Sequence, residues 1–256
     1  MKYIPLFFLF LLVPQLVFAQ SPMIYVRQGE QVIRDTAGDK PWPLASITKL
    51  MTALVLIDMK VNWNTPVKLI RADEVGGARL RVSVGGVYRR TDLLHASLMG
   101  SANNATNALA RSTGLTRQQF LARMNEKAKM LGMLDTKFVD PTGIKVGNIS
   151  TAHDIALLID AAAKNDLISS IGQKQVYTLE SIARRPRAHS IKNTNVLLAR
   201  GVPVQIAKTG FLYESMYNLA VQGTDATGKQ CTVVVLGAPT LAASFHLAQE
   251  FGNLHP

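Results

Sequence analysis

The amino-acid sequence predicts a mixed α/β protein: a single domain in which an antiparallel sheet is flanked by helices. Three observations support this prediction. Short β-type segments lie near the amino terminus, helical segments fill the middle of the chain, and β-type segments return after residue 170. This order favours one sheet whose strands come from both ends of the chain. The 256 residues are 48% hydrophobic and 18% charged, a composition that can fill a sizeable core.

The first 19 residues are predicted to be a signal peptide, and residues 20–256 to form the folded domain. Lys2 is the only charge in the first 26 residues, and an apolar run occupies residues 3–13. Pro14 and Gln15 interrupt this run, so it falls short of the ~20 apolar residues of a membrane span. Val17-Phe-Ala19 suits a signal peptidase. We therefore expect cleavage near Ala19, secretion into the periplasm and no stable membrane anchor.

The folded part begins with a predicted hairpin and a buried helix. Residues 23–26 and 31–34 are β-type and flank a Gln28-Gly29-Glu30 turn. From Ser46 the pattern becomes that of a helix buried on most sides, and Ser46 stands at its start. The apolar residues that define this helix are Ile47, Leu50, Met51, Leu54, Val55, Ile57 and Met59.

The remaining elements follow in chain order. Residues 65–90 are rich in Gly and Val and predict small strands and loops. Thr116 and Gln119 resemble a capping box, and Asp140-Pro-Thr-Gly143 predicts a turn. The helices are predicted at 91–100, 103–112, 116–131, 151–164 and 240–251, and the later strands at 175–179, 204–208, 217–222 and 232–236.

The charge and the rare residue types exclude several classes of function. The net charge of +11 would attract polyanions, but a charge of this size can equally serve only to keep the protein soluble. The basic residues are densest at Arg184-Arg185-Pro186-Arg187 and Arg89-Arg90, and no nucleic-acid motif accompanies them, so no nucleic-acid partner is expected. Cys231 is the only cysteine and lies in a predicted buried strand, which excludes an intrachain disulfide and favours an inert thiol. The five histidines show no metal-ligand spacing, so no metal or organic cofactor is expected.

Three short motifs occur in order along the chain: Ser46-Ile-Thr-Lys49, Ser101-Ala-Asn103 and Lys208-Thr-Gly210. Each alone could be a helix cap or a strand end. Ser46 and Lys49 would share one helix face, and a serine needs a nearby base to act as a nucleophile. A lysine in an apolar helix loses its charge more easily, because desolvation disfavours the ammonium. At a helix start, Ser46 would also have backbone N–H groups ready for developing negative charge.

Together these motifs resemble those of the low-molecular-mass penicillin-binding proteins, the serine D-alanyl-D-alanine carboxypeptidase family. The resemblance extends through residues 43–53, 98–105, 138–143 and 150–155, and covers the chain from about Ile24 to Gly237. It implies a β-lactamase/D,D-peptidase-like fold. It also implies peptidoglycan stem peptides as substrates and β-lactams as covalent inhibitors. Attraction to an anionic wall polymer would explain the basic net charge just as well as a need for solubility would.

The resemblance implies a role for each motif residue. Ser46 would attack the carbonyl carbon and form an acyl-enzyme, Lys49 would take its proton, and Ser101 would relay a proton. The remaining residues would bind the substrate. Asn103 would hydrogen-bond the substrate backbone, and Lys208 and Thr209 would bind its carboxylate. Gly210 belongs to the same strand, and the backbone N–H of Phe211 would form an oxyanion hole with the N–H of Ser46.

The resemblance favours the soluble D,D-endopeptidase branch typified by penicillin-binding protein 7, because little sequence follows the catalytic region. A D-alanyl-D-alanine carboxypeptidase and a catalytically silent wall-binding regulator remain alternatives. Residues 211–219 depart from the family pattern, and Ala102 replaces the Asp of the second motif. A class A β-lactamase is disfavoured, because none of the acidic residues between Asn103 and Lys208 lies in a Glu-x-x-Leu-Asn context.

Overall fold

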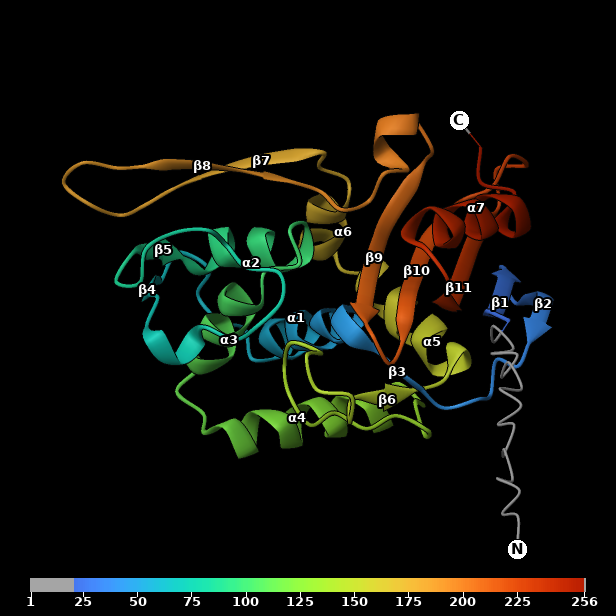
Figure 1. Ribbon diagram of the computed structural model, residues 1–256, viewed down its shortest axis with the longest axis horizontal. Helices are drawn as coiled ribbons and strands as arrows, with labels where there is room; N and C mark the ends of the chain where they lie inside the picture. The colour runs from blue at the N-terminus through green and yellow to red at the C-terminus, as the bar shows by residue number, and fades with distance from the viewer. Residues whose placement is uncertain (1–20, 256) are drawn as a thin grey trace, which may run out of the picture.

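The computed structural model describes residues 21–255, so the predicted signal peptide lies outside the described part. A five-stranded antiparallel sheet takes its strands from both ends of the chain, in the order β2-β1-β11-β10-β9 (Figure 1). Its strands are β1 (Met23–Gln28), β2 (Gln31–Thr36), β9 (Val204–Leu212), β10 (Met216–Thr224) and β11 (Gln230–Ala238). The predicted fold class is confirmed.

Helices and three small two-stranded sheets complete the molecule. The small sheets are β3 (Trp42–Pro43) with β6 (Ile149–Ser150), β4 (Pro66–Lys68) with β5 (Val87–Arg89), and β7 (Val176–Glu180) with β8 (Ala188–Lys192). The helices are α1 (Thr48–Asp58), α2 (Arg90–Leu98), α3 (Asn103–Arg111), α4 (Arg117–Met130), α5 (Ala152–Ala163), α6 (Asp166–Gly172) and α7 (Leu241–Gly252). Short 3-10 helices are η1 (Ala45–Ile47), η2 (Arg71–Asp73) and η3 (Leu198–Arg200).

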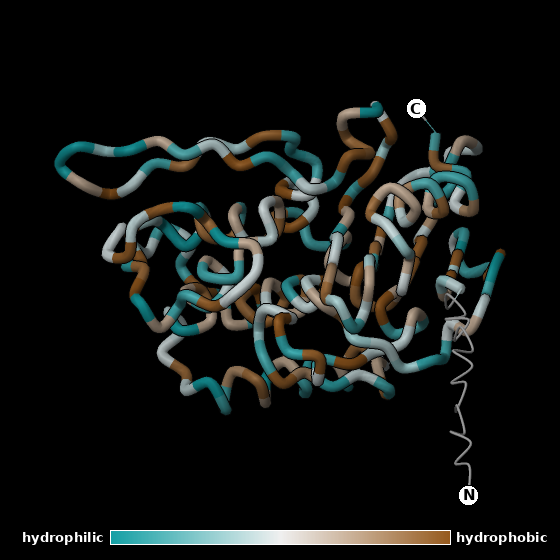
Figure 2. The backbone as a smooth tube through the Cα atoms, viewed as in Figure 1, coloured by the Kyte–Doolittle hydropathy of each residue, from teal (hydrophilic) through white to brown (hydrophobic). Residues whose placement is uncertain are grey.

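The sheet is buried on both faces, which explains the nearly continuous apolar run of β11. Val233 and Val235 pack with Phe245 of α7 on one face, whereas Val234 and Leu236 join the core made with α1 to α6 on the other. A strand covered on both sides needs apolar residues at successive positions rather than at alternate ones. Figure 2 shows this as apolar segments at the centre of the molecule and polar ones toward its rim.

The fold places the first motif, Ser46-Ile-Thr-Lys49, where the helices around α1 meet the five-stranded sheet. Helix α1 is buried along most of its length and lies among α2, α3, α4 and α5, while η1 at its start contacts β9 and β10 of the sheet (Figure 1). A central helix of this kind holds its first residues rigidly. The first residues of α1 therefore lie at the junction of η1 and the sheet strands β9 and β10.

The structure differs from the sequence predictions at several elements, among them the short β3, β6 and η3, which were not predicted. Ser46 lies in η1, and the α-helix itself begins at Thr48. Helix α6 was not predicted, because its seven residues are too few to show a helical period; the Asn165 side chain caps it by accepting the Ile168 N–H. Strand β8 was also missed, since it follows an Arg- and Pro-rich turn and only Ile191 of its residues is buried. The Thr116–Gln119 capping box is confirmed.

Candidate active site

The Ser46 hydroxyl lies beside a buried amine. Lys49 Nζ donates a hydrogen bond to Ser46 Oγ over 2.8 Å, as expected for side chains three positions apart on a helical segment. Ser46 is half-buried and within reach of solvent, whereas Lys49 is fully buried. The pair therefore has the form of a nucleophile with its base.

The turn at 140–143 holds Lys49 from the opposite side. Lys49 Nζ donates a second hydrogen bond, of 2.7 Å, to the carbonyl oxygen of Thr142. The Asp140 carboxylate fixes this turn by accepting the backbone N–H groups of Thr142 at 2.7 Å, Gly143 at 2.9 Å and Lys145 at 2.9 Å. The sequence predicted a turn here but gave no sign that it contacts Lys49, which is 93 positions away.

Burial lowers the pKa of Lys49 well below its usual value of 10.5, and the charge of Lys208 lowers it further. Asp140 acts in the opposite direction but is outweighed, because desolvation of the ammonium is the largest cause. The lowered pKa makes the neutral amine easier to form than in an exposed lysine. Lys49 is therefore suited to accept a proton from Ser46.

Two backbones approach closely at Ser46. Ala45, which precedes it, has a left-handed φ of +49°, and Gly143 has a φ of +85°. A Cβ at position 143 would lie 1.8 Å from the carbonyl oxygen of Ala45. Only glycine fits there, and the contact fixes the 140–143 turn against the nucleophile.

The second and third motifs meet through a second buried lysine. Lys208 Nζ, on β9, donates to Ser101 Oγ over 3.1 Å and to the carbonyl oxygen of Thr209 over 3.0 Å. Burial lowers the pKa of Lys208 to about 7. Ser101 has a φ of +57°, an uncommon value for a residue other than glycine, and such strain is often stored at functional sites.

Asn103 has a buried acceptor without a hydrogen-bond partner among the described residues. Its Nδ2 donates to the carbonyl oxygen of Gly76 over 2.7 Å, which fixes the orientation of the amide. The acceptor is the Oδ1 of the same amide. A buried acceptor of this kind is costly unless a ligand satisfies it, so Oδ1 is suited to a substrate N–H.

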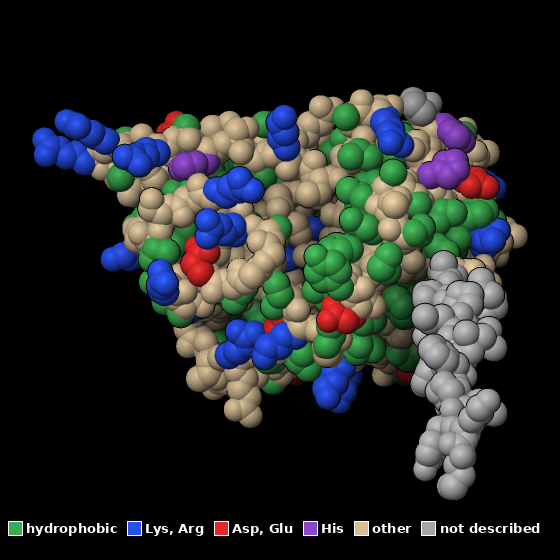
Figure 3. All heavy atoms as spheres, viewed as in Figure 1, with side chains coloured by type: hydrophobic (Ala, Val, Ile, Leu, Met, Phe, Trp, Pro, Cys, Tyr) green, Lys and Arg blue, Asp and Glu red, His purple; other side chains and the backbone are tan. Residues whose placement is uncertain are grey.

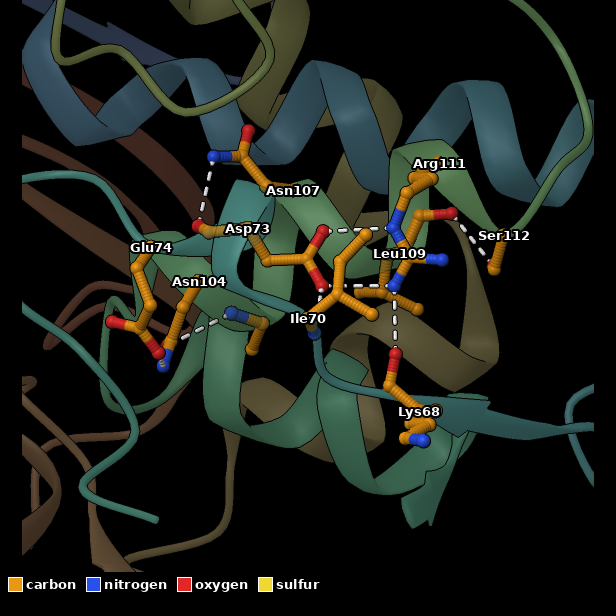
Figure 4. Close-up of polar contacts among 10 residues, drawn as sticks. Lys68, Ile70, Asp73, Glu74, Asn104, Asn107, Leu109, Arg111 and Ser112 are labelled. Carbon is orange, nitrogen blue, oxygen red and sulfur yellow. Dashed lines mark hydrogen bonds and ion pairs between the residues drawn. The ribbon is translucent and has the colours of Figure 1, made fainter. Parts of the chain in front are cut away.

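Helix α3 also fixes the segment 70–80, which includes Gly76, the hydrogen-bond partner of Asn103 (Figure 4). Asn104 donates to Glu74 Oε1 at 2.9 Å and Asn107 to the Asp73 carbonyl oxygen at 3.1 Å. Arg111 contacts both oxygens of the Asp73 carboxylate, at 2.9 and 2.8 Å. These residues follow Asn103 on one face of α3 and tie down the segment 70–80 that includes Gly76. Sequence reasoning missed them, although their spacing on the helix was a visible signal.

The last residues of β9 lie close to the nucleophile. A Cβ at Gly210 would be 3.0 Å from the Leu44 carbonyl oxygen and 3.2 Å from the Ser46 nitrogen, so glycine allows this approach. Thr209 Oγ1 donates to Thr194 Oγ1 over 3.0 Å. Phe211 is 42% exposed, and its ring lies 4.5 Å from that of Tyr217. The structure thus brings Ser46 together with Lys49 and Gly210, and Ser101 together with Lys208. Asn103, Thr209 and Phe211 lie within two positions of these residues in the chain.

Other chemistry-bearing side chains lie elsewhere or are inert. No group of three or more His, Cys, Asp or Glu side chains that could hold a metal ion occurs within residues 21–255. Cys231 is fully buried, and desolvation raises the pKa of its thiol to about 11. Across the same residues, no helix combines the length and apolar character needed to cross a membrane.

Comparisons with known proteins agree with this geometry. The family described as D-alanyl-D-alanine carboxypeptidase matches residues 13–240. A Pseudomonas aeruginosa protein named D-alanyl-D-alanine endopeptidase is 36% identical over 80% of this chain and 66% of its own length. A Haemophilus influenzae protein of the same name is 33% identical over 83% and 73%. The crystal structure of the Streptomyces K15 DD-transpeptidase superimposes with a TM-score of 0.85 at 26% identity, over 90% of this chain and 95% of that one.

Proposed function

The chain belongs to the D-alanyl-D-alanine carboxypeptidase family of serine D,D-peptidases, and we propose that it is a peptidoglycan D,D-endopeptidase with Ser46 as its nucleophile. The observation that carries the proposal is the hydrogen bond from the buried, low-pKa Lys49 to Ser46 Oγ. The relatives named above are endopeptidases, which favours cross-linked stem peptides over pentapeptides as substrates.

In the acylation step, neutral Lys49 takes the Ser46 proton while Ser46 Oγ attacks the carbonyl carbon of a D-alanyl residue. The negative charge that develops on the carbonyl oxygen is held by the backbone N–H groups of Ser46 and Phe211. The close approach of Gly210 to the Ser46 nitrogen supports this pairing, because it places the two N–H groups on adjacent backbones.

Collapse of the tetrahedral intermediate breaks the peptide bond and needs a proton on the leaving amine. Ser101 accepts a hydrogen bond from Lys208, and it relays to the leaving amine the proton that Lys49 took from Ser46. The leaving amine departs protonated, and Ser46 remains as an ester. Water then attacks this ester, releases the carboxylate product and returns the proton to Ser46.

The remaining site residues hold the substrate. Asn103 Oδ1 accepts a substrate N–H, which satisfies its buried acceptor. Thr209 and the Lys208 charge bind a carboxylate, and Gly210 leaves room for the substrate to lie along β9. Phe211 and the unusual residues after it form the edge of the site.

The identity of the bond that is cut is tested by incubating the protein with two muropeptides, a pentapeptide monomer and a D,D-cross-linked dimer. The products are identified by mass spectrometry. Conversion of the dimer to monomers with the pentapeptide intact is expected. Loss of one D-alanine from the pentapeptide alone would instead establish a carboxypeptidase. Turnover of neither, with Ser46→Ala protein behaving identically, would favour a wall-binding regulator.

We also propose that the protein is secreted to the periplasm after cleavage of residues 1–19, and that β-lactams acylate it. A substrate in the cell wall requires export, and the apolar run at 3–13 supports it. Amino-terminal sequencing of the mature protein from a periplasmic extract tests the cleavage site: the expected first residue is Gln20, and an intact Met1 would refute export by this route.

A further inference from the structure

A groove lies between the loop at 79–88 and the β7–β8 hairpin. It has a volume of about 550 Å³, and both of its walls carry arginines. Arg79 and Arg81 come from the loop, and Arg185 and Arg187 from the turn of the hairpin. The hairpin turn was the densest basic cluster in the sequence, and the mechanism makes no use of it.

The groove continues toward the catalytic residues. A second hollow, of about 250 Å³, shares Arg79, Arg81 and His189 with the groove and adds Lys192 of β8. Its inner end is lined by Gly100 and Ala102, the two neighbours of Ser101 in the chain. A ligand bound at the active site could therefore extend along a continuous surface to the hairpin.

The charge along this path has one sign. No acidic residue lines either hollow. Arg79 lies 3.6 Å from Glu74, but Arg81, Arg185 and Arg187 form no ion pair with any residue of the described part, 21–255. All three are exposed. Figure 3 shows Lys and Arg side chains gathered along the hairpin and the region below it, with few acidic ones among them.

The walls of the groove are held in position rather than loose. The Ile182 N–H of the hairpin donates to the Val87 carbonyl oxygen of β5 over 2.8 Å. At the other end of the hairpin, Tyr177 donates to Asp92 of α2 over 2.7 Å and stacks on His95 with ring centroids 3.6 Å apart. A fixed groove loses little entropy when it binds a ligand, which favours a binding role.

We propose that this groove binds the carboxylates of an acidic peptide joined to the substrate, namely the part of a stem peptide that extends beyond the scissile bond. The proposal rests on the proposed function and adds to it a preference for acidic substrates. A peptide is favoured over a free anionic polymer because the second hollow connects the groove to the two chain neighbours of Ser101, so that one molecule can reach both the groove and the active site. The arginine guanidinium suits carboxylates by geometry as well as by charge.

The test uses two synthetic D,D-cross-linked peptides with the same D-alanyl cross-link, one with two Glu and the other with two Gln in the strand whose amine is released by cleavage. Binding is measured by fluorescence anisotropy on Ser46→Ala protein, and kcat/KM on protein that retains Ser46. The groove variant is Arg185→Gln/Arg187→Gln. The control is Arg123→Gln/Lys164→Gln, which removes two exposed charges from α4 and from the end of α5, away from the groove.

With the control protein, the Glu peptide should bind about tenfold tighter than the Gln peptide at low salt, the effect of two or three exposed charge contacts. The groove variant should lose this preference and bind the Gln peptide unchanged. Equal binding of both peptides by the control, or an unchanged preference in the groove variant, would overturn the proposal. Tighter binding of a glycerol-phosphate polymer than of the Glu peptide would overturn the assignment to a peptide.

These outcomes separate the two proposals. If no protein cleaves either peptide, the proposed function fails, while the anisotropy of the Ser46→Ala protein still decides whether the groove recognises carboxylates. If both peptides are cleaved at equal rates and bound equally, the enzyme stands and the groove proposal fails.

Discussion

Substitution of Gly143 by alanine should disable Ser46 without removing any catalytic group. The new Cβ would lie 1.8 Å from the Ala45 carbonyl oxygen, and position 143 has a φ of +85°. The left-handed conformation costs an alanine ~1–2 kcal/mol, and relief of the overlap adds ~1–3 kcal/mol. Because the displaced backbone carries Ser46 on one side and the Thr142 carbonyl on the other, the Ser46–Lys49 pair should lose its geometry.

A matched control separates the effect of the steric overlap at position 143 from the free-energy cost of placing an alanine in a left-handed backbone conformation. Gly114, beyond the end of α3, has a φ of +81°, but a Cβ there would meet no atom within 4 Å. Gly114→Ala should therefore lower the free energy of unfolding by only ~1–2 kcal/mol and leave acylation unchanged.

The assay is the rate of acylation by a fluorescent penicillin, with melting temperature measured in parallel. A misplacement of about 1 Å can cost roughly a hundredfold in rate, and we expect a loss of that order for folded Gly143→Ala protein. If Gly143→Ala and Gly114→Ala acylate at the same rate, the idea that this contact positions the nucleophile is wrong.

Three further predictions concern the turn, the second lysine and the thiol. Asp140→Asn should lower the free energy of unfolding by ~1.5–3 kcal/mol and slow acylation, since the carboxylate accepts several N–H groups; chemical denaturation checks this, and an unchanged midpoint contradicts it. The pKa of Lys208 is lowered to about 7, so the unfolded state binds more protons than the folded state between about pH 7 and pH 10.4, and Lys208 makes stability rise with pH there. Lys208→Met should weaken this rise and stabilise the protein at pH 6 while impairing substrate binding; an unaltered pH profile of melting temperature contradicts it. Cys231, with its pKa raised to about 11 by burial, should react with iodoacetamide only on unfolding, and rapid labelling of active enzyme would refute this.

The sequence was sufficient for those parts of the site that depend on local spacing. Ser46 and Lys49 are three positions apart on one helical segment, so their contact follows from helix geometry. Likewise, the apolar run around Cys231 correctly indicated a buried strand, because a sheet covered on both faces needs it.

Contacts between distant segments could not be predicted in the same way. The carbonyl of Thr142 reaches Lys49 across 93 positions, and nothing in the turn sequence indicates its partner. The groove requires the loop at 79–88 to face a hairpin whose second strand, β8, was itself not predicted. Such placements depend on how the helices pack, and local patterns do not encode that packing.

The central claim is that Ser46 is the nucleophile of a serine D,D-peptidase. It is tested most directly by incubating the folded protein and Ser46→Ala with a fluorescent penicillin and mapping the adduct by peptide mass spectrometry. We predict one covalent adduct, located on Ser46 and absent from Ser46→Ala. A folded protein that forms no adduct, or one whose adduct persists in Ser46→Ala, would contradict the claim.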